Sequence, residues 1–296
     1  MPYQAASFAT ATSGSHTSMG RIVWIASYPK SGNTWLRAFL HNLLRNPTEA
    51  YDINKLTDFT LGDSQAHWFQ RFDPRPATEY SKEDLARLRP RVHELFTRTS
   101  PDSVFVKTHQ ALVEWGCAPM ITMPCTAGAF YVVRNPLDVV ISHSAHYGNS
   151  IDETIRIMAA RGAQTAAAET HVPELHGSWT ENVASWTARP HPGLHVVRYE
   201  DMQDRPYATF KGIVDFLRLP APRARIERAI RRSSFKVLQA QERRQGFREK
   251  SSSADLFFRA GTAGQWRRVL TSAQVEAVVA AHREQMARFG YWPLPR

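Results

Sequence analysis

The sequence predicts an α/β fold, a single domain in which a central, mostly parallel sheet is flanked by helices. Two observations support this prediction. Short apolar runs typical of buried strands alternate with longer stretches of helical periodicity. Polar residues follow the strands directly, as expected of open α/β sheets that bind ligands beyond the carboxyl ends of their strands. No segment rich in Gly, Pro and Ser divides the chain, so we expect one domain over residues 21–296.

Composition limits the classes of function. Residues 1–20 are rich in Ala, Ser, Thr and Gly without apolar periodicity, which predicts a disordered leader. The 37 Lys and Arg outnumber the 27 Asp and Glu, which favours an anionic partner without identifying it. The 2 cysteines fit a reducing cytoplasm. We expect no metal, because no ligand cluster is visible, and no membrane span, because no apolar run reaches about 18 residues.

The first predicted strand and helix enclose the most informative loop. Ile22–Ala26 is an apolar, largely β-branched run that predicts a buried strand. A turn around Gly32 follows, and then a helical pattern with Thr34 as its expected N-cap. Such a loop directs backbone N–H groups and the charge of Lys30 towards an anion.

This loop differs from the nucleotide-triphosphate loop G-x-x-x-x-G-K-[ST]. Lys30 precedes Gly32 instead of following it, and Ser27 replaces the first Gly of that pattern. We therefore expect a phosphate-like ligand but not the magnesium site that the triphosphate loop provides.

The remaining elements are predicted from periodicity and from turn residues. Further strands are expected at Ser103–His109, Ala129–Val133 and Leu194–Tyr199. Helices are expected from Ser81, as N-cap, to Phe96 with an end or kink at Pro90, and at 136–147, 151–169, 179–188, 206–217, 223–232 and 272–289. Residues 47–76 and 241–253 are expected to be irregular, and the second stretch mobile. Aromatic residues of the first stretch could form a wall of an acceptor pocket or pack among themselves.

Residues 28–35, Tyr-Pro-Lys-Ser-Gly-Asn-Thr-Trp, resemble the phosphosulfate-binding loop of sulfotransferases that use 3′-phosphoadenosine 5′-phosphosulfate (PAPS). The family has Thr where this chain has Asn33, and both side chains can hydrogen-bond an anion. The resemblance implies that Trp35 stacks on adenine. It implies that the anionic group is bound by Lys30, Ser31, Gly32, Asn33 and Thr34.

Lys107-Thr-His109 forms the end of the second predicted strand. A His at the carboxyl end of a strand can abstract a proton near neutral pH, although a lone His is more often a core or surface residue. The segment resembles the Lys-Thr-His of the family, with Ala111 where the family often has Pro. The resemblance implies that His109 is the general base and that Lys107 and Lys30 meet the charge on the sulfuryl group.

Arg134-Asn-Pro, followed by Asp138 and Ser142, is similar to the 3′-phosphate site of the family. A guanidinium and a hydroxyl converging from these positions can hold a phosphate. The resemblance implies that Arg134 and Ser142 bind the 3′-phosphate.

Residues 258–266 resemble the Arg-Lys-Gly-x-x-Gly-x-Trp stretch of the family, which implies phosphate contacts for Arg259 and Gly261. Ala260 replaces the Lys of the family and puts one cationic contact in doubt, for which Arg248 or Lys250 could substitute. Smaller matches imply nucleotide contacts for Tyr199, Ser234 and Phe235.

The matched segments run from Tyr28 to Trp266 in the order of the family. They imply a cytosolic-type, bacterial enzyme that moves a sulfuryl group in line from PAPS to a hydroxyl of a small acceptor. The product would be 3′-phosphoadenosine 5′-phosphate (PAP), and the acceptor could be aromatic or amphipathic. An Arg- and Ala-rich composition suggests a GC-rich bacterial genome. A tailoring role in secondary metabolism is a hypothesis that no residue pattern in the sequence supports.

Two other functions stay open, a magnesium-requiring P-loop kinase and a basic nucleic-acid-binding module. We expect no nucleic-acid partner, because the basic residues concentrate at strand ends and in helices after Arg223. Residues 267–276 have the spacing of the dimer segment of the family, but a helix N-cap at Thr271 or Ser272 explains them equally. A homodimer is therefore left open.

Overall fold

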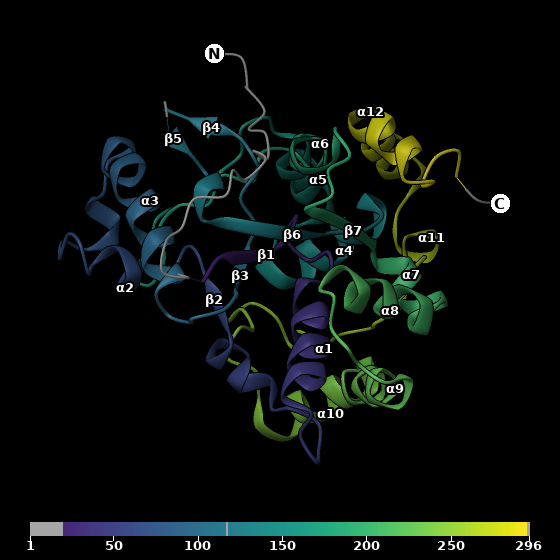
Figure 1. Cartoon of the computed structure of the whole chain (residues 1–296). Coiled ribbons are helices and arrows are strands. Elements are labelled where there is room, and N and C mark those ends of the chain that lie inside the picture. Colours follow the sequence, from purple (N-terminus) through teal and green to yellow (C-terminus); the bar gives the residue numbers. More distant parts are fainter. Residues whose placement is uncertain (1–19, 117, 295–296) are drawn as a thin grey trace. The chain divides into compact units, whose positions relative to one another are not determined.

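The computed structural model describes residues 20–116 and 118–294 (Figure 1). Apart from Gly20, the predicted leader lies outside the described residues, and the domain boundary at residue 21 stays a prediction. Within the described part, one five-stranded sheet has the order β2 (Thr60–Gly62), β3 (Val104–Thr108), β1 (Ile22–Ser27), β6 (Thr126–Val133), β7 (Leu194–Arg198). A separate pair is formed by β4 (Glu114–Trp115) and β5 (Ala118–Pro119).

Helices alternate with these strands along the chain. They are α1 (Asn33–Arg45), α2 (Ala66–Phe69), α3 (Lys82–Thr97), α4 (Pro136–Tyr147), α5 (Ile151–Ala159), α6 (Trp179–Thr187), α7 (Tyr199–Asp204), α8 (Pro206–Phe216), α9 (Arg223–Arg232), α10 (Phe235–Gln245), α11 (Trp266–Val269) and α12 (Ser272–Arg288). Short 3₁₀ turns are η1 (Ile53–Asp58), η2 (Ala77–Glu79) and η3 (Met123–Cys125). The predicted α/β class, with a central sheet flanked by helices, is confirmed. Among the described helices, none combines the length and the apolar character needed to cross a bilayer.

The chain divides into two compact units. Unit 1 contains the described residues up to Tyr28, with Thr60–Tyr131 and Ala160–Leu194. Unit 2 contains Pro29–Phe59, Val132–Ala159 and the described residues from His195 onward.

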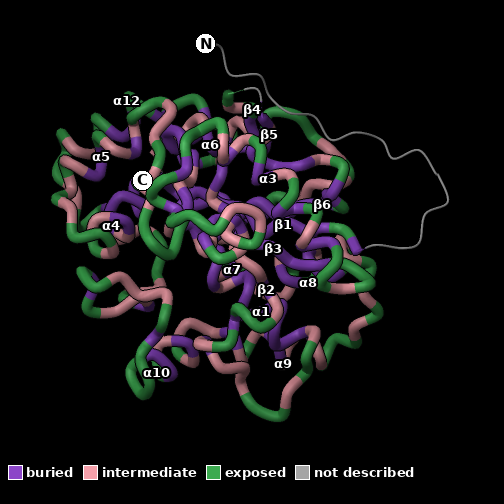
Figure 2. The backbone as a smooth tube through the Cα atoms, turned by 90° about the vertical axis from the view of Figure 1, so that its left-hand side faces the viewer, coloured by how far each residue is buried: buried purple, intermediate pink, exposed green. Residues whose placement is uncertain are grey.

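The core of unit 1 is built on parallel strands. β1 pairs with β3 so that Ile22 lies opposite Val104 and Ala26 opposite Thr108, and β2 pairs with β3 on its other side. Every residue of β1 is buried, as expected of a parallel strand covered on both faces (Figure 2). The apolar run in the sequence therefore predicted this strand correctly, one residue short of its end at Ser27.

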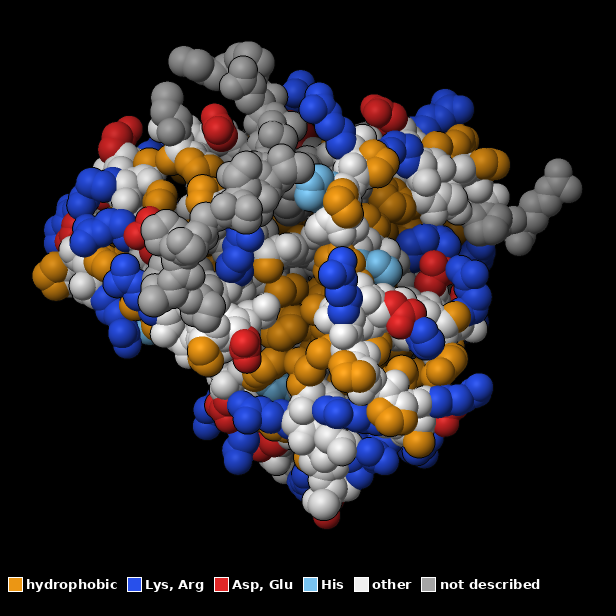
Figure 3. All heavy atoms as spheres, viewed as in Figure 1, with side chains coloured by type: hydrophobic (Ala, Val, Ile, Leu, Met, Phe, Trp, Pro, Cys, Tyr) orange, Lys and Arg blue, Asp and Glu red, His pale blue; other side chains and the backbone are white. Residues whose placement is uncertain are grey.

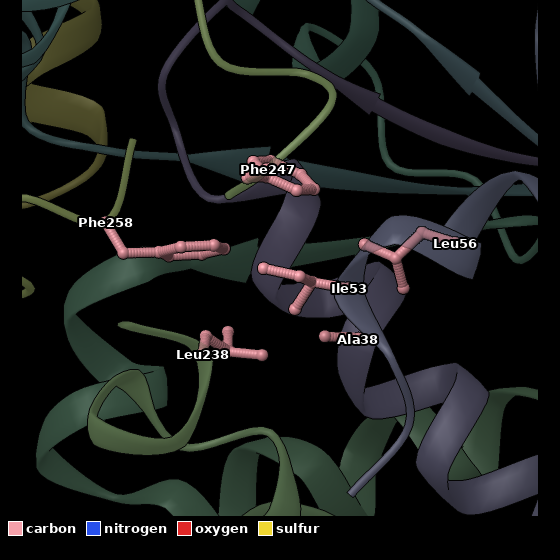
Figure 4. Packing of buried hydrophobic residues seen from close by; sticks show 6 residues of the cluster. All are labelled: Ala38, Ile53, Leu56, Leu238, Phe247 and Phe258. Carbon is pink, nitrogen blue, oxygen red and sulfur yellow. The ribbon is translucent and has the colours of Figure 1, made fainter. Parts of the chain in front are cut away.

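The core of unit 2 joins α1, η1, α10 and the segment that follows α10. Six buried side chains form one cluster in Figure 4, which are those of Ala38, Ile53, Leu56, Leu238, Phe247 and Phe258. Partly buried aromatic rings pack against it, and they include Trp35 and Phe235. The cluster thus fixes α1 against the start of α10.

The structure corrects the predicted start of α1. Gly32, and not Thr34, is the N-cap, and its φ of 108° lies in the left-handed region. A glycine adopts this conformation without the steric cost that Thr would incur. Thr34 is therefore the second residue of the helix.

Pro90 does not end α3, which was one of the two outcomes expected there. The helix continues to Thr97, close to the expected end at Phe96, because Leu88, Val92 and Phe96 are fully buried and their packing outweighs one lost hydrogen bond. Two other expectations were wrong. The helix expected over 151–169 ends at Ala159, and Gly162 follows with a φ of 63°. Residues 241–245, expected to be irregular, form the end of α10.

The N-terminus of α12 has a local explanation. The Thr271 side chain accepts a hydrogen bond from the Gln274 N–H, and the Gln274 side chain reciprocates. This capping box accounts for these two residues without a partner subunit. Ser81 and Asp84 form the same arrangement at α3, where Ser81 was the predicted N-cap.

Candidate active site

The loop before α1 lies in unit 2 and depends on a glycine for two reasons. Besides its positive φ, a Cβ on Gly32 would lie 2.7 Å from Cδ2 of Tyr199. Gly32 also has no side chain that could cap the helix, and the first turn of α1 contains no acidic residue. The N–H groups at this helix end are therefore well suited to an anionic ligand.

The Arg134 guanidinium connects two of the predicted binding segments. Its Nη1 donates a hydrogen bond of 3.1 Å to the carbonyl oxygen of Lys30. Its central carbon lies 4.2 Å from the ring centroid of Tyr199. The Trp35 ring meets the same tyrosine edge to face, with centroids 5.6 Å apart. Tyr199 thus contacts three residues that were predicted to bind the nucleotide.

Three polar atoms in this region are buried without a hydrogen-bond partner among the described residues. They are Ser31 Oγ, Trp35 Nε1 and Arg134 Nε. A buried polar group without a partner costs about 1–3 kcal/mol. All three belong to residues predicted from the sequence to hold the donor, so the region fits a ligand that supplies hydrogen-bonding groups.

Asp138 fixes the glycine-rich segment near the end of unit 2. Its carboxylate accepts hydrogen bonds from the Gly264 N–H at 2.6 Å and from the Trp266 N–H at 3.1 Å. The Gln203 side chain accepts from the Ala263 N–H at 3.0 Å and donates to the carbonyl of Gly261. α4 and α7 therefore both hold this segment in place.

Gly261 lies against α10. A Cβ at this position would come within 2.2 Å of the Phe235 ring, and the φ of Gly261 is 64°. Ser234 is the N-cap of α10, without a side-chain cap hydrogen bond. The structure thus brings Gly261 and Phe235 together, and it brings Gly32, Trp35, Arg134 and Tyr199 together as a second group.

The other predicted ligands are less closely tied. Ser142 is half-buried on α4, and Arg259 is exposed, with Nη2 3.1 Å from Oε1 of Gln265. Of the two cations that could replace the missing Lys at Ala260, Lys250 donates to the carbonyl of Ala254 at 2.6 Å and Arg248 is exposed.

His109 lies in unit 1, one residue beyond the end of β3. Its Nδ1 is 2.8 Å from the carbonyl oxygen of Ser27, which can only accept, so Nδ1 carries the proton. Nε2 is then the unprotonated nitrogen of the neutral ring. Burial lowers the pKa of His109 well below its usual value, and the charge of Lys107 lowers it further. The ring is therefore neutral at physiological pH and can accept a proton.

Glu174 is an anionic partner of Lys107 and His176. Its Oε1 is 3.8 Å from Nζ of Lys107, and its Oε2 is 3.0 Å from Nε2 of His176. Burial alone would raise the pKa of Glu174, but Lys107 and the hydrogen bond from His176 hold it well below its usual value. Glu174 is therefore ionised.

The pKa of Asp63 is raised and that of Glu174 is lowered, although both carboxyl groups are buried. Burial and the negative charge of Glu174 raise the pKa of Asp63 to about 7, against the opposing effect of Arg89. Its Oδ2 accepts a hydrogen bond of 2.8 Å from the Thr108 hydroxyl. Within the described residues, no group of three or more His, Cys, Asp or Glu side chains could hold a metal ion.

The sulfotransferase domain model matches residues 21–290 of this chain. The chain belongs to the sulfotransferase family. The family predicted from the sequence is thereby confirmed, and this chain is a PAPS-dependent sulfotransferase.

Similar proteins cover most of this sulfotransferase. Sulfotransferase 1A1 of Bos taurus is 26% identical over 273 residues, which are 89% of this chain and 82% of the relative. Sulfotransferase 2A1 of Rattus norvegicus is 26% identical over 278 residues, 90% of this chain and 84% of the relative. The crystal structure of mouse sulfotransferase SULT7A1 complexed with PAP has a TM-score of 0.59 at 18% identity, and the match covers 90% of this chain and 84% of that one. This likeness supports the predicted fold.

Sequence reasoning missed several residues that shape the site of this sulfotransferase. Glu174 and His176 lie between the helices expected at 151–169 and 179–188, in a stretch that was left unassigned, so nothing in the periodicity indicated their place beside Lys107. Gln203 and Glu242 act on backbone groups of residues 257–263, far from them in sequence. Only Asp138 had a signal, because it falls within the matched Arg134 segment.

Proposed function

We propose that this sulfotransferase transfers a sulfuryl group from PAPS to a hydroxyl of a small-molecule acceptor, with His109 as general base. When bound, PAPS supplies the sulfuryl group on a phosphate that can leave. His109 accepts the acceptor proton at Nε2, and the acceptor oxygen is then free to attack sulfur. Lys30 and Lys107 provide positive charge for the oxygens on which negative charge develops.

The donor would be held by unit 2. In this proposal the loop Lys30–Thr34 binds the 5′ anionic end, and Trp35 and Tyr199 contact the adenine. The 3′-phosphate ligands would be Arg134, Ser142, Arg259 and Gly261, with Ser234 and Phe235 beside the nucleotide. The observation that carries the proposal is the hydrogen bond from Arg134 to the carbonyl of Lys30, because it joins the two anion-binding segments predicted independently from the sequence.

The acceptor would be an aromatic or amphipathic alcohol. Nζ of Lys30 lies 3.6 Å from the ring centroid of Phe257, and the His146 ring meets the same ring edge to face at 5.5 Å. Tyr147, next to His146, is 42% exposed although it is a large aromatic residue. Aromatic surface beside the amine of Lys30 would favour an acceptor with an apolar body. Phe69 is fully buried in the core, which for this residue favours the second of the two alternatives left open for the aromatic stretch, internal packing.

The wider biological setting belongs to the same proposal. Composition supports a cytoplasmic, bacterial enzyme, and a role in secondary metabolism stays a hypothesis. Dimerisation through residues 267–276 stays open, because the capping box at Thr271 explains part of that segment without a partner.

Thermal unfolding with PAP tests the donor assignment. PAP at about 100 times its Kd should stabilise the wild-type chain by roughly 2.7 kcal/mol, and ATP with magnesium should not. Arg134→Ala should weaken PAP binding by about 2–5 kcal/mol, because a buried phosphate contact is lost. Arg231→Ala, which removes an exposed arginine of α9, is the matched control and should bind PAP normally.

A shift with ATP and magnesium but none with PAP would instead favour the kinase. A screen of hydroxyl compounds with labelled PAPS then identifies the acceptor, and transfer to none of the aromatic alcohols would contradict its proposed class.

A further inference from the structure

In unit 1, the segment Glu174–His176 is fastened to the segment that carries His109. The Ala111 N–H donates to the carbonyl of Leu175 at 2.8 Å, and the Leu175 N–H donates to Oε1 of Gln110 at 2.6 Å. Nδ2 of Asn182 donates to the carbonyls of both His109, at 3.1 Å, and His176, at 2.8 Å. These four hydrogen bonds fix the two segments relative to each other.

Ser64, Lys107 and His176 contact the Glu174 carboxylate. Oε1 accepts a hydrogen bond of 2.8 Å from the Ser64 hydroxyl and faces Lys107, while Oε2 pairs with His176. The Glu174 side chain is only 12% exposed, so its charge acts in a medium that screens weakly. The His176 ring in turn meets the His109 ring edge to face, with centroids 6.0 Å apart.

We propose that Glu174 is a positioning residue for sulfuryl transfer, because its carboxylate orients Lys107 and His176 and stabilises the positive charge that His109 acquires. This inference rests on the proposed function. In the step concerned, the acceptor O–H bond breaks and an N–H bond forms at His109 Nε2. The acceptor oxygen bonds to sulfur, and the bond between sulfur and the oxygen of the 5′-phosphate breaks, leaving its electron pair on that oxygen.

Among the charged and titratable groups around Glu174, Glu174 is the anion whose charge raises the pKa of His109. Those that face it are Lys107 of β3, Asp63 after β2, Arg89 of α3, and His109, His171 and His176 of the loops. Asp63 is partly protonated near neutral pH, since its pKa is raised to about 7. Glu174 and the Ser27 carbonyl both act against the lowering of the His109 pKa.

Glu174→Gln tests this role, because it keeps the shape of the side chain and removes only its charge. We expect kcat for sulfation, measured with the best acceptor of the screen, to fall at least about tenfold, as in other sites where the partner of a catalytic His is neutralised. The PAP dissociation constant should be unchanged, because the donor ligands lie in unit 2. Glu114→Gln, an equal charge change at an exposed position of unit 1, is the control and should leave both values unchanged.

Titration of the histidines followed by NMR distinguishes an electrostatic role of Glu174 from a purely structural one. We expect the pKa of His109 to fall further in Glu174→Gln, because the neutral amide no longer stabilises the imidazolium. His109→Ala identifies the signal among the 12 histidines. If Glu174→Gln does not fold, Glu174→Asp carries the kinetic test, because its charge is retained but one methylene further from Lys107 and His176.

The outcomes separate this inference from the proposed function. Wild-type kcat in Glu174→Gln, with an unchanged His109 titration and an inactive His109→Ala, would overturn the role of Glu174 alone. Wild-type sulfation by His109→Ala would overturn the general base and, with it, this inference. A change in PAP affinity equal to the change in kcat would also contradict the role, since it would indicate a general structural effect.

Discussion

Two glycines show how single residues shape the donor region of unit 2. Gly32 and Gly261 both have a positive φ, and at both a Cβ would collide with an aromatic ring. The rings belong to Tyr199 and Phe235, which are themselves predicted ligands of the nucleotide. The absence of a side chain therefore lets backbone and ring approach each other, beyond what the turn alone requires.

Gly261→Ala should lower the free energy of unfolding by more than the cost of placing Ala at a positive φ. Ala with a positive φ costs about 1–2 kcal/mol, and the overlap with Phe235 should add about 1–3 kcal/mol. Gly290→Ala is the matched control, because the φ of Gly290 is 70° and a Cβ there would meet nothing within 4 Å. Urea unfolding measures both variants, and equal losses of unfolding free energy would contradict the close-contact argument.

At the scale of elements, α9 holds the carboxyl end of α1, whose other end is the anion-binding loop. Nε and Nη2 of Arg225 donate to the carbonyls of Leu43 at 2.8 Å and Leu44 at 3.1 Å. Arg228 donates to the Asn46 side chain just beyond the helix. Figure 3 shows Lys and Arg side chains along its lower edge, where α9 and α10 lie, mixed with acidic ones. Part of the positive charge in the sequence therefore stabilises a helix terminus instead of facing a polyanion.

Arg225→Ala should lower the free energy of unfolding by about 1–3 kcal/mol, because two terminal carbonyls of α1 lose a charged donor. Arg231→Ala removes a neighbouring exposed arginine from the same helix and should change stability by less than about 0.5 kcal/mol. Chemical denaturation compares the two variants. Equal effects would mean that the basic face of α9 acts only through its overall charge.

Local signals predicted the elements that depend on local interactions. An apolar run predicted β1. Ser81 was predicted correctly as an N-cap, and Pro136 as the first residue of a helix. α10 was missed beyond Phe235 because its buried face includes Gln241 and Glu242. These polar residues are satisfied by backbone groups of Ile53, Tyr51, Phe257 and Phe258, which no periodicity reveals.

The predicted site shows the same limit. Arg134 and Tyr199 were identified because each belongs to a family motif at the end of a predicted strand. Arg134 directly follows one strand, and Tyr199 is the last residue of another. Glu174 was not identified, because its place beside Lys107 depends on hydrogen bonds that link residues 109–111 to residues 175–182. Long-range pairing of this kind is set by the fold and leaves no pattern in the local sequence.

At the scale of the whole molecule, the predicted residues separate by unit. Every predicted nucleotide ligand, from Lys30 to Gly261, belongs to unit 2, whereas Lys107 and His109 belong to unit 1. Donor binding and proton transfer should therefore respond to different substitutions. Arg134→Ala should act on PAP affinity, and His109→Ala should act on turnover.

The most direct test measures the PAP dissociation constant and the rate of sulfation together in His109→Ala. We expect turnover to fall by about 10²–10⁴-fold, the usual contribution of a general base, while PAP binds as tightly as to the wild type. Undiminished turnover in that variant would contradict the role of His109 as general base.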